Sequence, residues 1–472
     1  MLFFPQPKRC FPLTHAGLIS VVAVCALGAC AVGPTYHRPA LATPTVYKEL
    51  DGWVQATPAD GSDRSDWWTW FDDPVLTGLM QQVAVSNQNV AAATAAYAQA
   101  RATVREQRAA LFPVVTLDGS GRRAGGAGNA NPGNNFQANI GASWEPDVWG
   151  RLHRAAESAD ASAAASAADL ASALLSVRGE LATDYLSLRQ SDAQRVLLQA
   201  TVSGYQRALL ITQNRYRAGI APKTDLLQAQ TQLANAQADE AGLTRQRAQF
   251  EHAIAVLIGQ MPGNFSLPVL ASWQPVVPTV PVGVPSTLLQ RRPDIAAAER
   301  RVAATNEQIG IAQAARYPNL GLSGNTGTGG RTVADLFAVS TNVWSLGVSA
   351  AQVLFNAGAT KARVESAQAV QEQAAARYRQ TVLVAFEAVE DQLAASRILT
   401  QQKSLREQAS NAADQTEAQA LNRYRAGQVS YTDVVAAQAS ALAARRALVQ
   451  LNADRQVNAV ALIQALGGGW QP

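Results

Sequence analysis

The sequence predicts an α+β fold in which long antiparallel coiled-coil helices flank two pairs of short antiparallel strands, arranged as two tandem repeats. Three observations predict it. One hexapeptide occurs twice, long stretches keep a heptad-like spacing of apolar residues, and four segments alternate apolar with polar side chains. Hydrophobic residues make up 48% of the 472 residues but aromatic residues only 6%, so alanine supplies much of the apolar share. Such a composition suits helices whose backbones approach closely.

The first thirty residues predict a lipoprotein signal peptide. Lys8 and Arg9 precede an apolar run at 16–27. Its last residue begins the sequence Leu-Gly-Ala-Cys at 27–30, which resembles the lipobox of bacterial lipoproteins. The run is shorter than the roughly 20 apolar residues that a membrane-spanning helix needs. We therefore predict cleavage after residue 29 and a covalent diacylglycerol and N-acyl lipid on Cys30. An ordinary signal peptide whose cleavage site happens to carry a cysteine is the alternative.

Cysteine usage and charge narrow the class of protein. The other two cysteines, Cys10 and Cys25, lie within the predicted signal peptide, so the mature chain needs neither a disulfide nor a redox role. Ala31 follows the acylated cysteine, where an aspartate would favour retention in the inner membrane, and this predicts the outer membrane. The net charge of +4 arises from 39 basic and 35 acidic residues without a basic block, which argues against nucleic acid as a partner.

An internal repeat divides the chain. The hexapeptide NRYRAG occupies residues 214–219 and again 422–427, an offset of 208 residues, and a proline-rich stretch separates the two copies. The predicted parts are a signal peptide (1–29), an N-terminal equatorial segment (30–73), a first repeat (74–260), a proline-rich linker (261–285), a second repeat (286–467) and a C-terminal tail (468–472). Each repeat holds a helix, two strands, a long helix, a tip turn (214–222 or 422–430) and a closing helix.

The long helices follow from spacing and length. Apolar residues step by three and four along Leu170, Leu174, Val177 and Leu181, which is typical of coiled-coil packing. Residues 150–219 would reach roughly 100 Å as one helix, so two shorter helices stacked end to end, at about 74–111 and 223–258, are needed to line it. The second repeat gives helices at about 286–316, 358–421 and 430–466. Two separate helical bundles are the alternative.

Four strands are predicted at about 114–124, 135–146, 318–327 and 342–353, joined in pairs by Gly- and Asn-rich links. Strands with one apolar and one polar face could simply cover the core of a soluble domain. Their length instead matches a tilted transmembrane strand of about ten residues, and their flanking helices are too long to fold over them. Lipid tolerates no open sheet edge, so the four strands of one chain must close with other copies. Three copies give twelve strands and a polar lumen, which predicts a transmembrane antiparallel β-barrel formed by a homotrimer.

Four motifs carry a family resemblance over essentially the whole mature chain: WWTWFDDPVL at 67–76, WEPDVWGR at 144–151, LQRRPDIAAAER at 289–300 and YPNL at 317–320. Together they resemble the outer membrane factor family of the TolC-like superfamily, and within it the NodT-type lipoproteins of RND efflux systems. The resemblance implies a trimeric outer-membrane channel that exports drugs, toxic compounds or metal cations from a Gram-negative periplasm. It also implies a periplasmic adaptor and an inner-membrane RND pump as partners.

The repeated turns predict the periplasmic tip. Gly219 and Gly427 suit a left-handed residue that ends a helix, and Asp225 and Asp433 lie in the first turn of the next helix, where a carboxylate favours the helix dipole. The resemblance further implies a gate at this tip. Its candidate residues are Asp225, Tyr424, Asp433, Arg215, Tyr216, Gly219, Arg423 and Gly427.

Within that gate we expect Asp225 to bond Tyr424 between neighbouring hairpins and Asp433 to project into the constriction. Two positions depart from the family pattern: Ala436 replaces a second pore carboxylate, and Val429 replaces an arginine. The lock is therefore expected to be looser than in relatives, or differently made.

No catalytic, cofactor or metal site is predicted. The four histidines are isolated, and no phosphate-binding or nucleophile motif occurs. The aromatic cluster at 67–71 is interpreted as packing. A type I protein secretion channel and a periplasmic coiled-coil lipoprotein without a channel are the alternative functions.

Overall fold

The structure is a computed structural model that describes residues 31–41, 44, 46–50, 66–125, 133–280, 291–338 and 342–469. The predicted signal peptide and Cys30 lie outside the described residues, as do most of the C-terminal tail and the first two residues of the LQRRPDIAAAER motif. The helices and strands below all fall within these ranges.

Each repeat folds in the predicted order. The first contains α2 (Pro74–Ser86), α3 (Gln88–Ala109), β1 (Val114–Ala124), β2 (Gly133–Trp144), α4 (Arg151–Arg217) and α5 (Lys223–Leu257). The second contains α7 (Pro293–Ala314), β3 (Asn319–Gly330), β4 (Asn342–Ala351), α8 (Ala359–Arg425) and α9 (Tyr431–Ala465). The long helices α4 and α8 both have 67 residues, and the closing helices α5 and α9 both have 35, which confirms the duplication.

The helix predicted at 74–111 is wrong in one respect, because it is two helices divided at Asn87. The side-chain oxygen of Asn87 accepts hydrogen bonds from the amides of Asn89 (2.9 Å) and Val90 (3.1 Å), which begins α3. Its side-chain nitrogen donates to the carbonyl of Leu257 at 2.7 Å, at the end of α5. A buried asparagine therefore caps one helix and the end of another, and the chain bends there.

The link after β3 is also shorter than predicted. β3 continues to Gly330, and a 3-10 helix at Val333–Phe337 follows, capped by Thr332 in a capping box with Asp335. Other 3-10 turns occupy Lys48–Leu50, Trp67–Phe71 and Pro262–Asn264.

The described residues form two compact units. The first combines described parts of Met1–Pro39, Ala98–Ala165 and Glu299–Arg377, and the second combines described parts of Ala40–Tyr97, Ser166–Ala298 and Tyr378–Pro472. Each unit therefore draws on both repeats. The first holds the sheet, and the second holds both tip turns.

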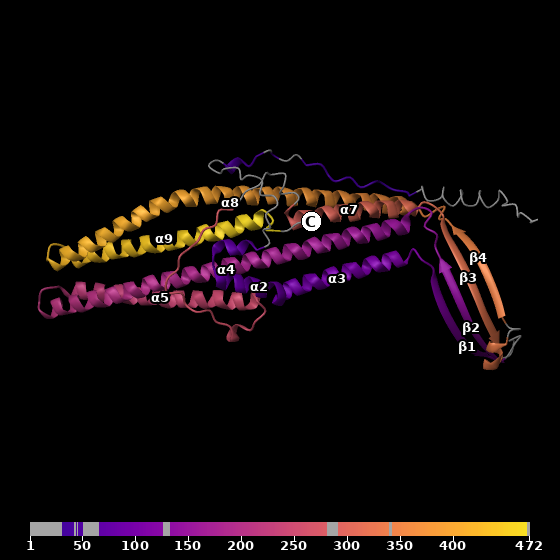
Figure 1. Ribbon diagram of the computed structural model, residues 1–472, viewed down its shortest axis with the longest axis horizontal. Coiled ribbons are helices and arrows are strands. Elements are labelled where there is room, and N and C mark those ends of the chain that lie inside the picture. The colour runs from indigo at the N-terminus through magenta and orange to yellow at the C-terminus, as the bar shows by residue number, and fades with distance from the viewer. Residues whose placement is uncertain are drawn as a thin grey trace, which may run out of the picture. The chain divides into compact units, whose positions relative to one another are not determined.

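In the first unit, β1, β2, β3 and β4 lie side by side in chain order, all antiparallel (Figure 1). The register places the apolar rows of all four strands on one face. Leu117 lies opposite Ile140, Trp144 opposite Leu322, and Leu322 opposite Val348. Since a slip of one residue would invert a strand, this shared face confirms the predicted alternation.

That face is exposed in a single copy. Several of its large apolar side chains lie in water in the isolated chain: Val115 (68% exposed), Leu117 (78%), Trp344 (79%), Leu346 (80%) and Val348 (76%). The opposite face carries small and polar residues, among them Thr116, Asn139, Ser323 and Ser345. The sheet therefore has one apolar and one polar face, and along β1 and β4 both faces are exposed in a single copy, so no part of this copy covers the apolar face as a soluble core would.

In the second unit, α5 runs alongside α4, and α9 alongside α8 (Figure 1). Val202 and Tyr205 of α4 form a small core with Ala236 of α5, and Arg445 of α9 bonds Asp414 and Glu417 of α8. The aromatic cluster is packed as predicted. Trp67, Trp68 and Phe71 are buried against one another, and the Arg178 guanidinium lies 4.6 Å from the centre of the Trp68 ring.

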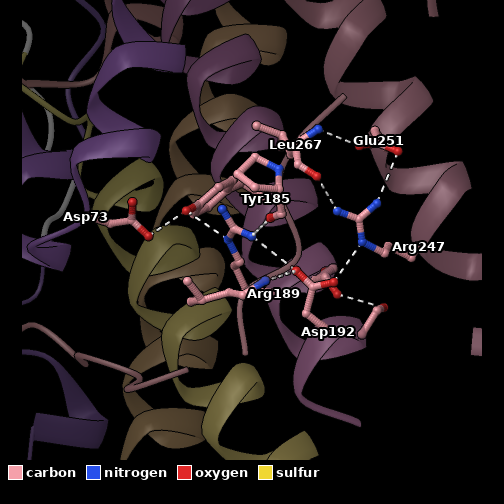
Figure 2. A network of polar contacts seen from close by, with 11 residues as sticks. Asp73, Tyr185, Arg189, Asp192, Arg247, Glu251 and Leu267 are labelled. Atoms are coloured by element: carbon pink, nitrogen blue, oxygen red, sulfur yellow. Dashed lines mark hydrogen bonds and ion pairs between the residues drawn. The ribbon is translucent and has the colours of Figure 1, made fainter. Parts of the chain in front are cut away.

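A buried polar network fastens the chain after α5 onto α4 (Figure 2). Asp192, fully buried, accepts hydrogen bonds from Arg189 at 3.1 Å and from Arg247 of α5 at 2.7 Å. Arg247 also donates to the carbonyl of Leu267, and Arg189 donates to the carbonyl of Pro268. Two arginines and one carboxylate thus satisfy one another and the backbone of the segment that covers them.

The same network reaches the start of α2. The Tyr185 hydroxyl accepts from Arg189 and donates to Asp73 at 2.6 Å, and Asp73 is the N-cap of α2. One connected set of hydrogen bonds therefore joins α2, α4, α5 and the segment after α5 (Figure 2). Among the residues described, none of the helices combines the length and the apolar character that a membrane span requires.

Candidate functional site

The two repeated turns end the long helices as predicted. Gly219 and Gly427 have φ angles of +73° and +76°, the left-handed conformation that glycine adopts without strain. After α4, the Ile220 amide donates to the Arg215 carbonyl at 2.9 Å. After α8, the Gln428 amide donates to the Arg423 carbonyl at the same distance. The same hexapeptide therefore builds the same turn twice.

Arg215 connects the first turn to the second. Its guanidinium carbon lies 4.7 Å from the centre of the Tyr424 ring, and one of its terminal nitrogens donates to the Tyr424 carbonyl at 3.3 Å. A cation over an aromatic face is attracted to the ring electrons, most strongly where water is excluded. Tyr424 is 4% exposed, so this contact is shielded from solvent.

Tyr424 belongs to a small core at the tip, together with Ala229, Tyr431 and Val434. Its ring lies 5.3 Å from that of Tyr431, and burial raises the pKa of the Tyr431 hydroxyl to about 12. The ring of Tyr424 holds the two turns together within one copy, while its buried hydroxyl has no hydrogen-bond partner among the described residues.

The two carboxylates differ. Asp433 completes a capping box with Ser430: the Ser430 hydroxyl and amide donate to its carboxylate at 2.8 and 3.0 Å. Asp225 has no such partner, because Pro222 stands where Ser430 stands in the second turn. Burial raises the pKa of the Asp225 carboxyl above its ordinary value, and the nearby Arg215 opposes this shift. Asp433 is thus a structural cap, and Asp225 is the less satisfied carboxylate.

Within one copy no hydrogen bond joins Asp225 to Tyr424 among the described residues. The predicted bond between them, and the predicted projection of Asp433 into a constriction, remain predictions for the assembled channel. The structure does bring Arg215 onto Tyr424, and Arg215 also lies near enough to Asp225 to influence its carboxyl group. It leaves Tyr216 (40% exposed) and Arg423 at the surface.

Sequence reasoning missed Tyr431 and Ser430. A signal for Ser430 was present, since Ser-x-x-Asp before a helix is a capping-box pattern and the first turn lacks it. Tyr431 carried no signal, because its burial depends on the first hairpin.

The residues that follow Cys30 pack closely against the rest of the first unit through hydrogen bonds and a close backbone contact. The Val32 amide donates to the Trp149 carbonyl at 3.1 Å, and Asn306 of α7 donates to the Pro34 carbonyl at 3.2 Å. Gly33 has a φ of +126°, and a Cβ there would lie 2.6 Å from the Cα of Gly310. The chain therefore runs in close contact with the junction between β2 and α4 from Ala31 onward.

The chain resembles known efflux proteins along its length. Residues 79–260 and 284–468 match the outer membrane efflux protein family. The cation efflux system protein CusC of Escherichia coli O6:H1 is 29% identical over 456 residues, which cover 96% of this chain and 99% of CusC. The toluene efflux pump outer membrane protein TtgC of Pseudomonas putida is 29% identical over 467 residues, covering 97% and 96%.

The solved structure of the outer-membrane channel OprN superposes with a TM-score of 0.83 at 31% identity, covering 94% of this chain and all of that one. The family match spans both repeats, and the structural match includes the helices and the strands. This chain belongs to the outer membrane efflux protein family, and it is a channel component of an efflux system and not an enzyme.

Proposed function

We propose that three copies of this chain close a twelve-stranded barrel in the outer membrane of a Gram-negative bacterium, above a helical tunnel. The trimer passes small molecules that an inner-membrane RND pump delivers through a periplasmic adaptor. The names of CusC and TtgC associate those relatives with cations and toluene, and substrates of this chain are proposed among drugs, toxic compounds and metal cations.

The sheet with one apolar and one polar face is the observation that supports the trimer best. β1 and β4 are its two edges, and they run antiparallel to each other because four strands alternate in direction. β4 of one copy can therefore pair with β1 of the next without breaking the alternation. Closure removes the open edges that lipid does not tolerate and leaves the apolar rows outward.

The tip is proposed as the gate, held within each copy by Arg215 on the Tyr424 ring. We expect Arg215→Met to raise the single-channel conductance of the protein in planar bilayers several-fold, because methionine keeps the length of the side chain but not its charge. The wild type is expected to conduct poorly in the same bilayers. Arg217→Met is the matched control, since Arg217 is an exposed arginine at the end of the same helix.

Two variants of Tyr424 separate the ring from the hydroxyl. Tyr424→Phe retains the aromatic face and is expected to stay near wild type, whereas Tyr424→Leu is expected to conduct like Arg215→Met. A rise with Tyr424→Phe would instead support the predicted bond from Asp225 to the hydroxyl. No rise with either Arg215→Met or Tyr424→Leu would reject this gate.

We further propose that Cys30 carries the lipid anchor. The close fit of residues 31–34 beside the end of β2 supports it, because an acyl chain on the preceding residue would emerge where the strands begin. Cys30→Ala is expected to lose incorporation of labelled palmitate in cells. Cys25→Ala, which changes a cysteine of the predicted signal peptide, is expected to keep the label. Retained label in the Cys30 variant would exclude this anchor.

A further inference from the structure

Each copy uses only one of its two possible arginine–tyrosine contacts at the tip. Arg215 of the first turn lies on Tyr424 of the second. The counterparts 208 residues away are Arg423 of the second turn and Tyr216 of the first. Both are exposed, and neither side chain makes a hydrogen bond or ion pair with any residue that the structure describes.

The surface around Tyr216 also exposes apolar side chains whose counterparts in the second hairpin are packed. Leu227 is 49% exposed, although its counterpart Val435 packs against the core around Tyr424. Tyr216 itself is 40% exposed, against 4% for Tyr424. Tyr216 and Leu227 of the first hairpin are therefore exposed at positions whose counterparts in the second hairpin pack against the first. Exposed apolar groups in such an arrangement mark an interaction surface.

The repeat indicates what covers this surface. A closed ring of three copies contains six tip turns, in which first and second turns alternate. Within one copy, the first turn contacts the second. If the same contact is repeated around the ring, the second turn of each copy contacts the first turn of the neighbouring copy. Resting on the proposed trimer, we infer that Arg423 of one copy lies over the Tyr216 ring of the next copy when the tip is closed.

This contact would complete the ring. Three arginine–tyrosine contacts would lie within copies and three between them. Each turn would then contact one turn of its own copy and one turn of a neighbouring copy. The tips could then separate only by breaking the contacts between copies or those within them. The contacts between copies are the ones that a separation of whole chains at the tip would break first.

Cysteine cross-linking tests the inference with little background, since Cys30 is the single cysteine outside the predicted signal peptide. The variant carries Tyr216→Cys and Arg423→Cys in the full chain, purified in detergent and treated with a short bismaleimide. A spacer is needed because an arginine and a tyrosine in cation–π contact hold their Cα atoms beyond the reach of a disulfide. Denaturing gels are expected to show covalent dimers and trimers.

Three controls define the outcome. Each single cysteine variant is expected to remain monomeric on these gels. The pair Arg215→Cys and Tyr424→Cys is expected to react with the spacer without joining chains. The pair Tyr216→Cys and Arg425→Cys is expected to cross-link several-fold less, because Arg425 lies two residues on and projects from another side of the helix.

The native mass in detergent separates this inference from the proposed function. A trimer whose 216/423 pair stays monomeric on denaturing gels would overturn the contact and leave the channel proposal standing. A trimer that cross-links equally through Arg425→Cys would also overturn it. A native mass of one chain would overturn the trimer, and the inference with it.

Discussion

Leu346→Arg is expected to remove most of the assembled protein from the outer membrane. Leu346 lies in the middle of β4 on the apolar face, and it is 80% exposed in a single copy because nothing in that copy covers it. In the proposed barrel this face meets lipid. An arginine near the bilayer midplane costs about 2–4 kcal/mol, and a trimer contains three of them. The measurement is the amount of heat-modifiable trimer in outer-membrane fractions.

Ser345→Arg is the matched control for this prediction. Ser345 is the preceding residue of the same strand, so its side chain points to the opposite, polar face. There an arginine would reach a wet lumen, and assembly is expected to stay near the wild-type amount. If Ser345→Arg lowered assembly as much as Leu346→Arg, the assignment of the two faces would be wrong.

The sheet could be predicted from sequence because its signals are local. Apolar and polar residues alternate along part of each strand, and turn-forming residues separate the strands of each pair, so the face of each strand follows from its own residues. The observed β1 matches the predicted range, and β2, β3 and β4 differ from theirs by no more than three residues at either end. The register places these four apolar rows, each predicted from its own strand, on the same face.

The break in the first helix shows the limit of that reasoning. The sequence after Asn87 is rich in alanine and the sequence before it carries no proline beyond the first position of α2, so one helix is expected, and an asparagine is only a weak reason to divide it. The division follows because its side-chain nitrogen binds the end of α5, 170 residues away. A contact so distant in sequence leaves no local signal.

The tip presents the same limit more sharply. Residues 214–219 and 422–427 are identical, yet Tyr424 is buried and Tyr216 is exposed. No local rule can distinguish two identical hexapeptides. The difference comes from the neighbouring hairpin, which the second turn finds within its own chain. For the first turn, we propose that the corresponding neighbour is the second turn of the next copy.

The buried network was likewise hidden in the sequence. Arg189 and Asp192 are three residues apart, and Arg247 and Glu251 are four apart, spacings that usually mark exposed ion pairs on a helix. They are buried because the segment at 267–270 lies over them and offers its own backbone groups as partners. These charged residues are buried only because the segment after α5 passes over this face of α4 and α5.

Asp192→Ala is expected to cause the largest loss of stability in the second unit. It leaves Arg189 and Arg247 buried without the carboxylate that balances them, and breaking one member of a buried ion pair costs about 3–5 kcal/mol. The remaining partners of each arginine are neutral groups or Glu251, so they compensate only in part. The measurement is denaturant unfolding of the purified protein in detergent.

Asp239→Ala isolates the effect of burial. Asp239 also accepts from an arginine, Arg446 at 3.1 Å, but its side chain is 52% exposed. An exposed pair contributes about 1 kcal/mol at most, because water solvates either partner once the other is removed. Asp192→Asn should fall between the two, since an amide keeps one hydrogen-bond acceptor but not the charge. Equal losses for Asp192→Ala and Asp239→Ala would mean that the segment at 267–270 does not exclude water from the network, and that this segment is held to α4 by something other than these charges.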